Sequence, residues 1–310
     1  MHSILKSLIK QIINFLGWGS PDQHSRRCFK YRWYVIIILS CLLFLLNNTD
    51  DPSPIIFVLC LFPDRIIQGW PAVAGQFPHQ VHLRMVTPTG SLNACGGSLI
   101  TSQWVLTAAH CLFYFLLINN NLTLKTQVFV RLGTLDVTFP GMLLEATDFF
   151  IHPRYNPTSL NNDLGLINLG REVPISATIK PIRLPGLDAI NVTFAGEVAT
   201  VSGWGRTGNT LPVSETLNYV NVTIITNAIC LYDYSSMYIV DSTICSIGIQ
   251  NTGDSGGPLI HYGSDGEPTL IGVVNFVSSR GCDSGYAAGY VRPQFFLDWI
   301  NESIANSNDL

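Results

Sequence analysis

The chain has 310 residues, of which 47% are hydrophobic and 12% charged, and its formal charge at pH 7 is −4. This mild acidity leaves no basic surface for nucleic acid, so nucleic-acid binding is excluded as a main function. The part of the chain that follows Ile66 is long enough for a domain with a substantial core.

An apolar run from Trp33 to Leu46 follows basic residues and precedes acidic ones. This charge order indicates that the C-terminal side crosses the membrane. The run is shorter than the roughly 20 residues of a transmembrane helix and suits the apolar region of a signal peptide, so we expect a secreted protein. Because a long leader precedes the run, a type II membrane anchor remains an alternative. A further alternative is that the true initiator lies elsewhere.

The segment Asp64–Gly69 indicates a proteolytic activation site, in which cleavage after Arg65 frees the ammonium group of Ile66. Apolar residues directly after Arg65 and the turn that follows favour this interpretation over an exposed linker. We therefore predict a leader and pro-segment over 1–65, one domain over 66–304 and a short tail over 305–310.

Short β-rich runs separated by turn residues predict a largely β domain. The expected strands include Gly97–Ile100, Gln127–Leu132, Ala199–Ser202 and Leu270–Val274. A helical period appears only near Phe295–Ile304, where the apolar residues Phe296, Ile300 and Ile304 predict a closing C-terminal helix.

Three side chains together provide the groups for nucleophilic catalysis: His110 in TAAHC, Asp163 in NNDL and Ser255 in GDSGGP. A serine hydroxyl needs a neutral imidazole to take its proton, and the imidazole needs a carboxylate to fix its tautomer. Taken singly, His110 could be a packed histidine, Asp163 a turn residue and GDSGGP an ordinary loop. The joint occurrence in the order His, Asp, Ser favours a catalytic triad.

With these motifs the chain resembles the chymotrypsin/trypsin-like serine endopeptidases from about Ile66 to Ile300. The stretch Phe276–Cys282 is similar to insect and crustacean digestive members. The resemblance implies an all-β fold of two packed six-stranded antiparallel β-barrels with a C-terminal helix. It also implies disulfides Cys95–Cys111 and Cys230–Cys245, which fit an oxidising compartment.

The same resemblance implies an oxyanion hole made by the backbone N–H groups of Gly253 and Ser255. After cleavage at Arg65, the new Ile66 terminus is expected to pair with Asp254 and so to order this turn and the substrate pocket. We expect no metal or organic cofactor. The expected partners are protein or peptide substrates, an activating protease and protein inhibitors, and the chain is expected to be a monomer.

The sequence departs from the family pattern just before the GDSGGP turn. Family members carry a cysteine there that bridges to the position of Cys282, but Ile249–Thr252 contains none. Cys282 is then free or paired with Cys60, or else codons are missing from this stretch. The interval between Cys245 and Ser255 is also short, and it builds one wall of the pocket.

Two further departures affect the site. Asn275 occupies the position of a serine that hydrogen-bonds the catalytic aspartate; it can still donate, but its size would shift Asp163. The apolar run Leu112–Leu117 is an insertion, interpreted as an exosite, as part of the core or as translated intron.

The expected substrate pocket is apolar. Its residues are Ile249, Gln250, Asn275, Phe276, Val277 and Ala288. None supplies the carboxylate that cleavage after Arg or Lys requires, and Val277 near the pocket throat favours small or medium apolar residues.

Asn-x-Ser/Thr sequons support secretion, and they begin at Asn47, Asn121, Asn191, Asn221 and Asn301. We therefore expect a secreted glycoprotein zymogen that hydrolyses peptide bonds through an acyl-enzyme at Ser255. The alternative is a weak or inactive protease homologue that acts by binding, which the missing bridge and Asn275 favour and the intact triad opposes.

Overall fold

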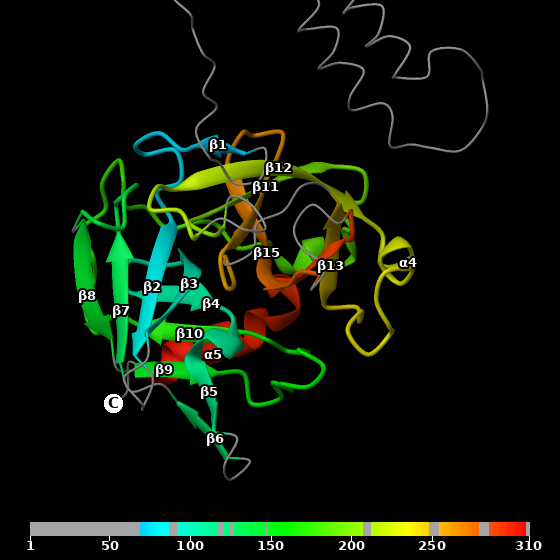
Figure 1. Cartoon of the computed structure of the whole chain (residues 1–310), viewed down its shortest axis with the longest axis horizontal. Helices are drawn as coiled ribbons and strands as arrows, with labels where there is room; N and C mark the ends of the chain where they lie inside the picture. The colour runs from blue at the N-terminus through cyan, green and yellow to red at the C-terminus, as the bar shows by residue number, and fades with distance from the viewer. Residues whose placement is uncertain are drawn as a thin grey trace, which may run out of the picture. The chain divides into compact units, whose positions relative to one another are not determined.

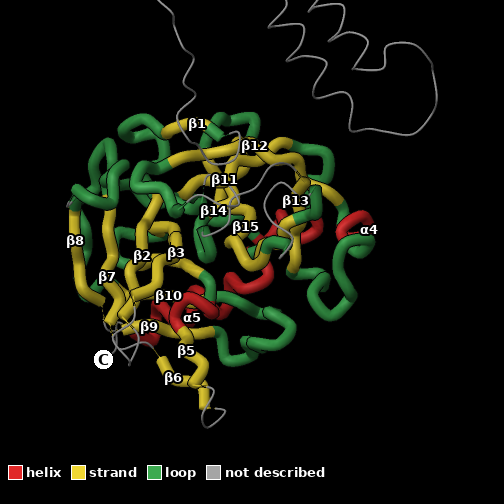
Figure 2. Tube along the Cα trace, in the orientation of Figure 1, coloured by secondary structure: helices red, strands yellow, loops and turns green. Residues whose placement is uncertain are grey.

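Strands dominate the part of the chain that the computed structural model describes. These residues are 69–86, 92–116, 121–124, 127–139, 141–146, 148–206, 212–247, 254–278 and 285–307. Two seven-stranded antiparallel sheets contain most of the strands, and a separate hairpin contains the remaining two (Figures 1 and 2).

The first sheet has the strand order β8-β7-β2-β3-β4-β10-β9. Its strands are β2 (Gln80–Val86), β3 (Leu92–Leu99), β4 (Trp104–Thr107), β7 (Gln127–Leu132), β8 (Met142–Ala146), β9 (Asp148–Ile151) and β10 (Gly165–Asn168). Alternate residues of β2, namely Val81, Leu83 and Met85, are fully buried, so one face of this strand forms the core of the first sheet.

The second sheet has the order β1-β12-β11-β14-β15-β16-β13, and pairing of β12 with β13 closes six of its strands into a barrel. Its strands are β1 (Trp70–Pro71), β11 (Val198–Gly203), β12 (Asn218–Ile225), β13 (Thr243–Ile247), β14 (Pro258–Tyr262), β15 (Pro268–Phe276) and β16 (Ala288–Val291). Val220, Val222 and Ile224 alternate along β12 and point into the barrel core.

Within the described residues, helices are short except at the C-terminal end. The structure has α3 (Ala109–Leu112), α4 (Asn227–Cys230), α5 (Leu297–Ser307) and the 3₁₀ helices η1 (Leu187–Asn191) and η2 (Pro293–Phe296). Phe296 and Ile300 are buried in the core that contains the buried residues of the first sheet, and Ile304 packs against this core. This confirms the expected closing helix and its apolar face. Within the described residues no helix is long and apolar enough to cross a membrane; Trp33–Leu46 lies outside them.

The insertion after Cys111 begins in the core and continues as a hairpin. Leu112 is fully buried, and a Cβ atom at Gly165 would lie only 2.6 Å from its Cδ1 atom. The chain then pairs β5 (Phe113–Leu116) with β6 (Asn121–Leu124), and this hairpin extends away from both sheets in Figure 1.

Disulfides join Cys95 to Cys111 and Cys230 to Cys245, each with a Cα–Cα distance of 6.3 Å. Both expected bridges are therefore present. Cys60 and Cys282 lie outside the described residues. The closed six-stranded barrel, the first sheet and the C-terminal helix confirm the expected chymotrypsin-like architecture.

Candidate active site

His110 and Asp163 meet because of the pairing between β4 and β10. These strands are antiparallel, with Thr107 opposite Gly165. His110 follows the end of β4 in α3, and Asp163 precedes the start of β10. Since the end of one antiparallel strand lies beside the start of its partner, both residues emerge at the same edge of the first sheet.

Two hydrogen bonds connect these residues. The backbone N–H of His110 donates to Asp163 Oδ1 at 2.8 Å, and His110 Nδ1 lies 2.6 Å from Asp163 Oδ2. The carboxylate is fully buried, whereas the imidazole side chain is 26% exposed. When Nδ1 donates to the carboxylate, the neutral ring has its lone pair on Nε2, so this histidine can accept a proton there.

Tyr155 is a neighbour of Asp163 that the sequence did not indicate. Burial, together with the negative charge of Asp163, raises the pKa of the Tyr155 phenol. The phenol therefore stays protonated near the carboxylate over the whole physiological pH range. No motif could have revealed it, because Tyr155 lies on an ordinary-looking turn and only the fold brings it close.

Ser255 lies in a turn that is anchored to the first sheet. Its carbonyl oxygen accepts a hydrogen bond from the Gly96 N–H at 2.8 Å and lies 3.4 Å from Cys111 Sγ. Cys111 directly follows His110, so the Ser255 backbone is held beside the element that carries the imidazole. Gly253, the other expected oxyanion residue, lies outside the described residues.

Gly256 fits this turn in a way that no other residue would. Its φ is +79°, a conformation that side chains rarely adopt. A Cβ atom there would overlap Thr107 Oγ1 and lie 2.8 Å from the Gly96 carbonyl oxygen. The Thr107 hydroxyl itself donates to that carbonyl at 2.8 Å. The turn is therefore packed directly against β3 and β4.

Asp254 is buried at the base of the same turn. Its Oδ1 accepts a hydrogen bond from the Gly205 N–H at 2.7 Å. The carboxylate is packed so closely on Gly203 that any side chain there would overlap it. Arg65 and Ile66, the expected activation residues, lie outside the described residues.

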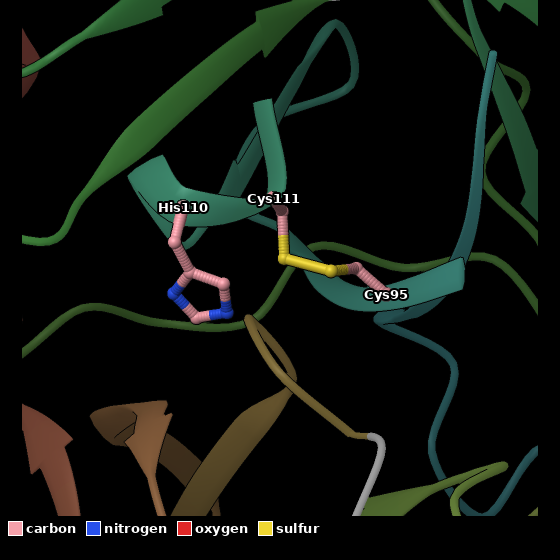
Figure 3. A group of neighbouring side chains, drawn as sticks. All are labelled: Cys95, His110 and Cys111. Carbon is pink, nitrogen blue, oxygen red and sulfur yellow. A yellow bond between two sulfur atoms is a disulfide. The ribbon is translucent and has the colours of Figure 1, made fainter. Parts of the chain in front are cut away.

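Cys95, His110 and Cys111 form a close group, shown in Figure 3. Their potential ligand atoms all lie within 4.8 Å of one another. The two sulfur atoms are bonded to each other, so neither is a thiolate that could bind a metal ion. The disulfide instead ties α3 to β3, the strand on which Ser255 is anchored.

The expected pocket residues lie at the ends of β15 and β16, except Ile249 and Gln250, which lie outside the described residues. Val277 and Ala288 line a small apolar cavity, about the size of one water molecule, together with Asp254, and the other lining residues are Val201, Val220, Val274 and Tyr290. Phe276 lies elsewhere: its ring covers Gly289 and packs against Tyr234, with ring centroids 4.9 Å apart.

Two residues that sequence reasoning missed fix the segment that leads into β16 at Ala288. Asp233 Oδ2 accepts from the Ala287 N–H at 2.8 Å, and the Tyr234 hydroxyl donates to the Ala287 carbonyl at 2.5 Å. Burial raises the pKa of Tyr234 to about 12, so this phenol remains a donor. Their only sequence signal is their position shortly after Cys230, in a segment joined by disulfide to β13.

Asn275 does not replace the family serine in a simple way. Its Nδ2 atom donates to the Leu160 carbonyl at 3.1 Å, and the residue is 8% exposed. Leu160 lies in the loop that leads to Asp163. Asn275 therefore contacts the backbone of this loop just before Asp163.

Comparisons with known proteins cover the region that contains these residues. A family model described as Trypsin matches residues 66–300. Collagenase from Hypoderma lineatum is 36% identical over 244 residues, which cover 77% of this chain and 87% of the collagenase. Brachyurin from Leptuca pugilator is 34% identical over 243 residues, which cover 76% of this chain and 96% of brachyurin.

The fold matches as well. The solved structure titled HL collagenase has a TM-score of 0.67 and 36% sequence identity, and the match covers 77% of this chain and 98% of that one. His110, Asp163 and Ser255 all lie within the region matched by the family model.

Proposed function

Since the chain belongs to the trypsin family and is a serine endopeptidase, we propose that His110, Asp163 and Ser255 are its catalytic triad. Ser255 Oγ attacks the substrate carbonyl while His110 Nε2 takes the hydroxyl proton. His110 then returns that proton to the leaving amine, and water hydrolyses the acyl-enzyme by the same route. Asp163 holds the imidazole and stabilises its cationic form.

The observation that carries this proposal is the 2.6 Å contact between His110 Nδ1 and a fully buried Asp163 carboxylate, beside the anchored Ser255 turn. The oxyanion of the tetrahedral intermediate would be bound by the N–H groups of Gly253 and Ser255. A slowly deacylating ester substrate tests the proposal. Mass spectrometry should locate its acyl group on Ser255, and an adduct on any other residue would contradict the assignment.

We further propose that the chain is a zymogen activated by cleavage after Arg65. The new ammonium group of Ile66 pairs with Asp254, whose carboxylate is buried and held by Gly205. An ammonium group entering this site gains a charged partner, and the turn that contains Ser255 becomes ordered. Asp254→Asn should be cleaved normally after Arg65 yet remain inactive, whereas full activity of that variant would refute the pairing.

The pocket that we propose accepts small or medium apolar residues. Val277 and Ala288 line an apolar cavity, and the carboxylate that also lines it belongs to Asp254. In the proposed active form Asp254 is paired with the Ile66 ammonium group, so it is not available to a basic substrate residue. Cleavage-site profiling on a peptide library should therefore give apolar residues at the position before the scissile bond. Preferential cleavage after Arg or Lys would contradict this proposal.

We place the mature enzyme outside the cell, as a monomer that meets protein substrates, an activating protease and protein inhibitors. The two disulfides suit an oxidising compartment. Asn191, Asn221 and Asn301 are exposed sequon residues, available for glycosylation. Expression in a secretory host should give glycosidase-sensitive protein in the medium. Retention in membranes would instead indicate the type II anchor.

A further inference from the structure

A side-chain hydrogen bond connects β15 of the second barrel to the loop before Asp163. Asn275 Nδ2 donates to the Leu160 carbonyl at 3.1 Å across 115 residues of sequence. Asn275 is nearly buried, so water competes little for this bond.

The Leu160 backbone is strained where this bond is made. Leu160 has a φ of +54° and Asn162 a φ of +55°, both in the left-handed region. For a leucine this conformation costs about 1 kcal/mol or more and persists only where the surroundings enforce it. Two left-handed residues in three positions set the direction in which the chain enters Asp163.

Asn162 has its own support, whereas Leu160 depends on Asn275. Asparagine tolerates the left-handed region, and Asn162 Nδ2 donates to the Arg154 carbonyl at 2.8 Å. The neighbouring Asn161 carbonyl accepts from the Asn156 N–H at 3.0 Å. Leu160 has no polar side chain with which to stabilise itself, and the Asn275 amide supplies the bond to its carbonyl.

Only one half of the Asn275 amide has a hydrogen-bond partner among the described residues. Among the described residues nothing donates a hydrogen bond to its Oδ1, which is buried. A buried acceptor without a partner is destabilising and requires an explanation. The bond made by Nδ2 provides one.

We propose that Asn275 is a positioning residue that acts on catalysis through Leu160. Its amide holds Leu160 in the left-handed conformation and thereby fixes the Asp163 carboxylate against His110. The inference rests on the proposed triad. Asn275 thus supports the loop that carries the Asp163 carboxylate, whereas the family serine at this position hydrogen-bonds the carboxylate itself.

The test is a double-mutant cycle on the activated enzyme with Asn275→Ala and Leu160→Gly. Glycine adopts the left-handed region without help, so it should remove the need for the tether. We expect Asn275→Ala to lower kcat by about 3- to 10-fold with little change in KM. In the Leu160→Gly background the same change should lower kcat by less than about 2-fold.

The pH profile separates positioning from a structural effect. A looser Asp163 stabilises the imidazolium less, so the acid limb of kcat/KM should move to lower pH in Asn275→Ala. Asn227→Ala is the matched control, because Asn227 Nδ2 donates to the Val240 carbonyl at 3.0 Å within the connection between β12 and β13, which contains no residue of the proposed triad. This control should lower stability and leave the acid limb unchanged.

Equal losses of kcat in both backgrounds, or an unmoved acid limb in Asn275→Ala, would overturn the proposal. Urea unfolding of the same four proteins gives a readout that needs no catalysis, since the tether predicts coupling between the two changes there too. If activated wild-type protein is inactive, the proposed function fails, and the unfolding cycle alone still decides whether the tether exists. Additive unfolding effects would show that it does not.

Discussion

The buried His79 and the half-buried His82 should make this protein sensitive to mild acid. His79 is 1% exposed, and burial lowers its pKa to about 3. Burial lowers the pKa of His82 to about 4, with smaller contributions from the positive charges of Arg131 and Arg84. Both imidazoles are therefore largely neutral in the folded protein at about pH 5 and above.

The unfolded chain behaves differently, because its histidines titrate near 6.5. As the pH falls below that value, the unfolded state binds two protons that the folded state does not bind, and stability is lost. At pH 5 each histidine is about 1.5 pH units below its unfolded pKa, which corresponds to roughly 2 kcal/mol. Together they should lower the free energy of unfolding by about 4 kcal/mol between pH 7.5 and 5.

Urea unfolding followed by tryptophan fluorescence measures this loss, with Ser255→Ala as the parent protein to prevent self-digestion. His82→Phe keeps a ring against Trp204, whose centroid lies 5.3 Å from that of His82. This variant should lose only about half as much stability over the same pH range. A parent curve that is flat from pH 7.5 to 5, or a variant that retains the full loss, would refute the reasoning.

Three further predictions concern the site. Asp163→Asn should lower kcat by about 10³- to 10⁴-fold at neutral pH, because an amide neither fixes the tautomer nor stabilises the imidazolium; kinetics on active-site-titrated enzyme measures it, and a loss below 10-fold would contradict the assigned role. Gly256→Ala should abolish activity and destabilise the protein by more than about 2 kcal/mol, because the new Cβ atom overlaps Thr107. The control is Gly266→Ala, at a glycine that is also left-handed but has open space around it; this variant should stay active and lose about 1 kcal/mol. Urea unfolding measures both losses. Val277→Gly should shift peptide-library cleavage towards large aromatic residues, since it removes a side chain that lines the cavity, and an unchanged profile would place the specificity determinant elsewhere.

Much of the fold was predictable because its signals are local. The predicted strand Gln127–Leu132 coincides with β7, and the apolar spacing of Phe296, Ile300 and Ile304 gave the closing helix. Both follow from periodicity over a few residues. The two disulfides came from the family resemblance, and the structure contains both.

The contacts around the site could not be predicted from local sequence patterns. The partner of Asn275 is Leu160, and no local pattern relates residues 115 positions apart. From sequence alone the insertion after Cys111 is interpreted as an exosite, as part of the core or as translated intron. The structure shows a buried Leu112 followed by a hairpin, because Phe113–Leu116 pairs with the later segment Asn121–Leu124. Tyr155 approaches Asp163 only once the loop is folded.

The most direct test of the central claim is labelling with a serine-directed phosphonate probe. The purified precursor is cleaved after Arg65, the new Ile66 terminus is verified by sequencing, and labelling is compared with that of uncleaved precursor and of cleaved Ser255→Ala. The account predicts a label on Ser255 only in the cleaved wild-type protein. An unlabelled protein after verified cleavage would contradict it, and so would labelling that persists in Ser255→Ala.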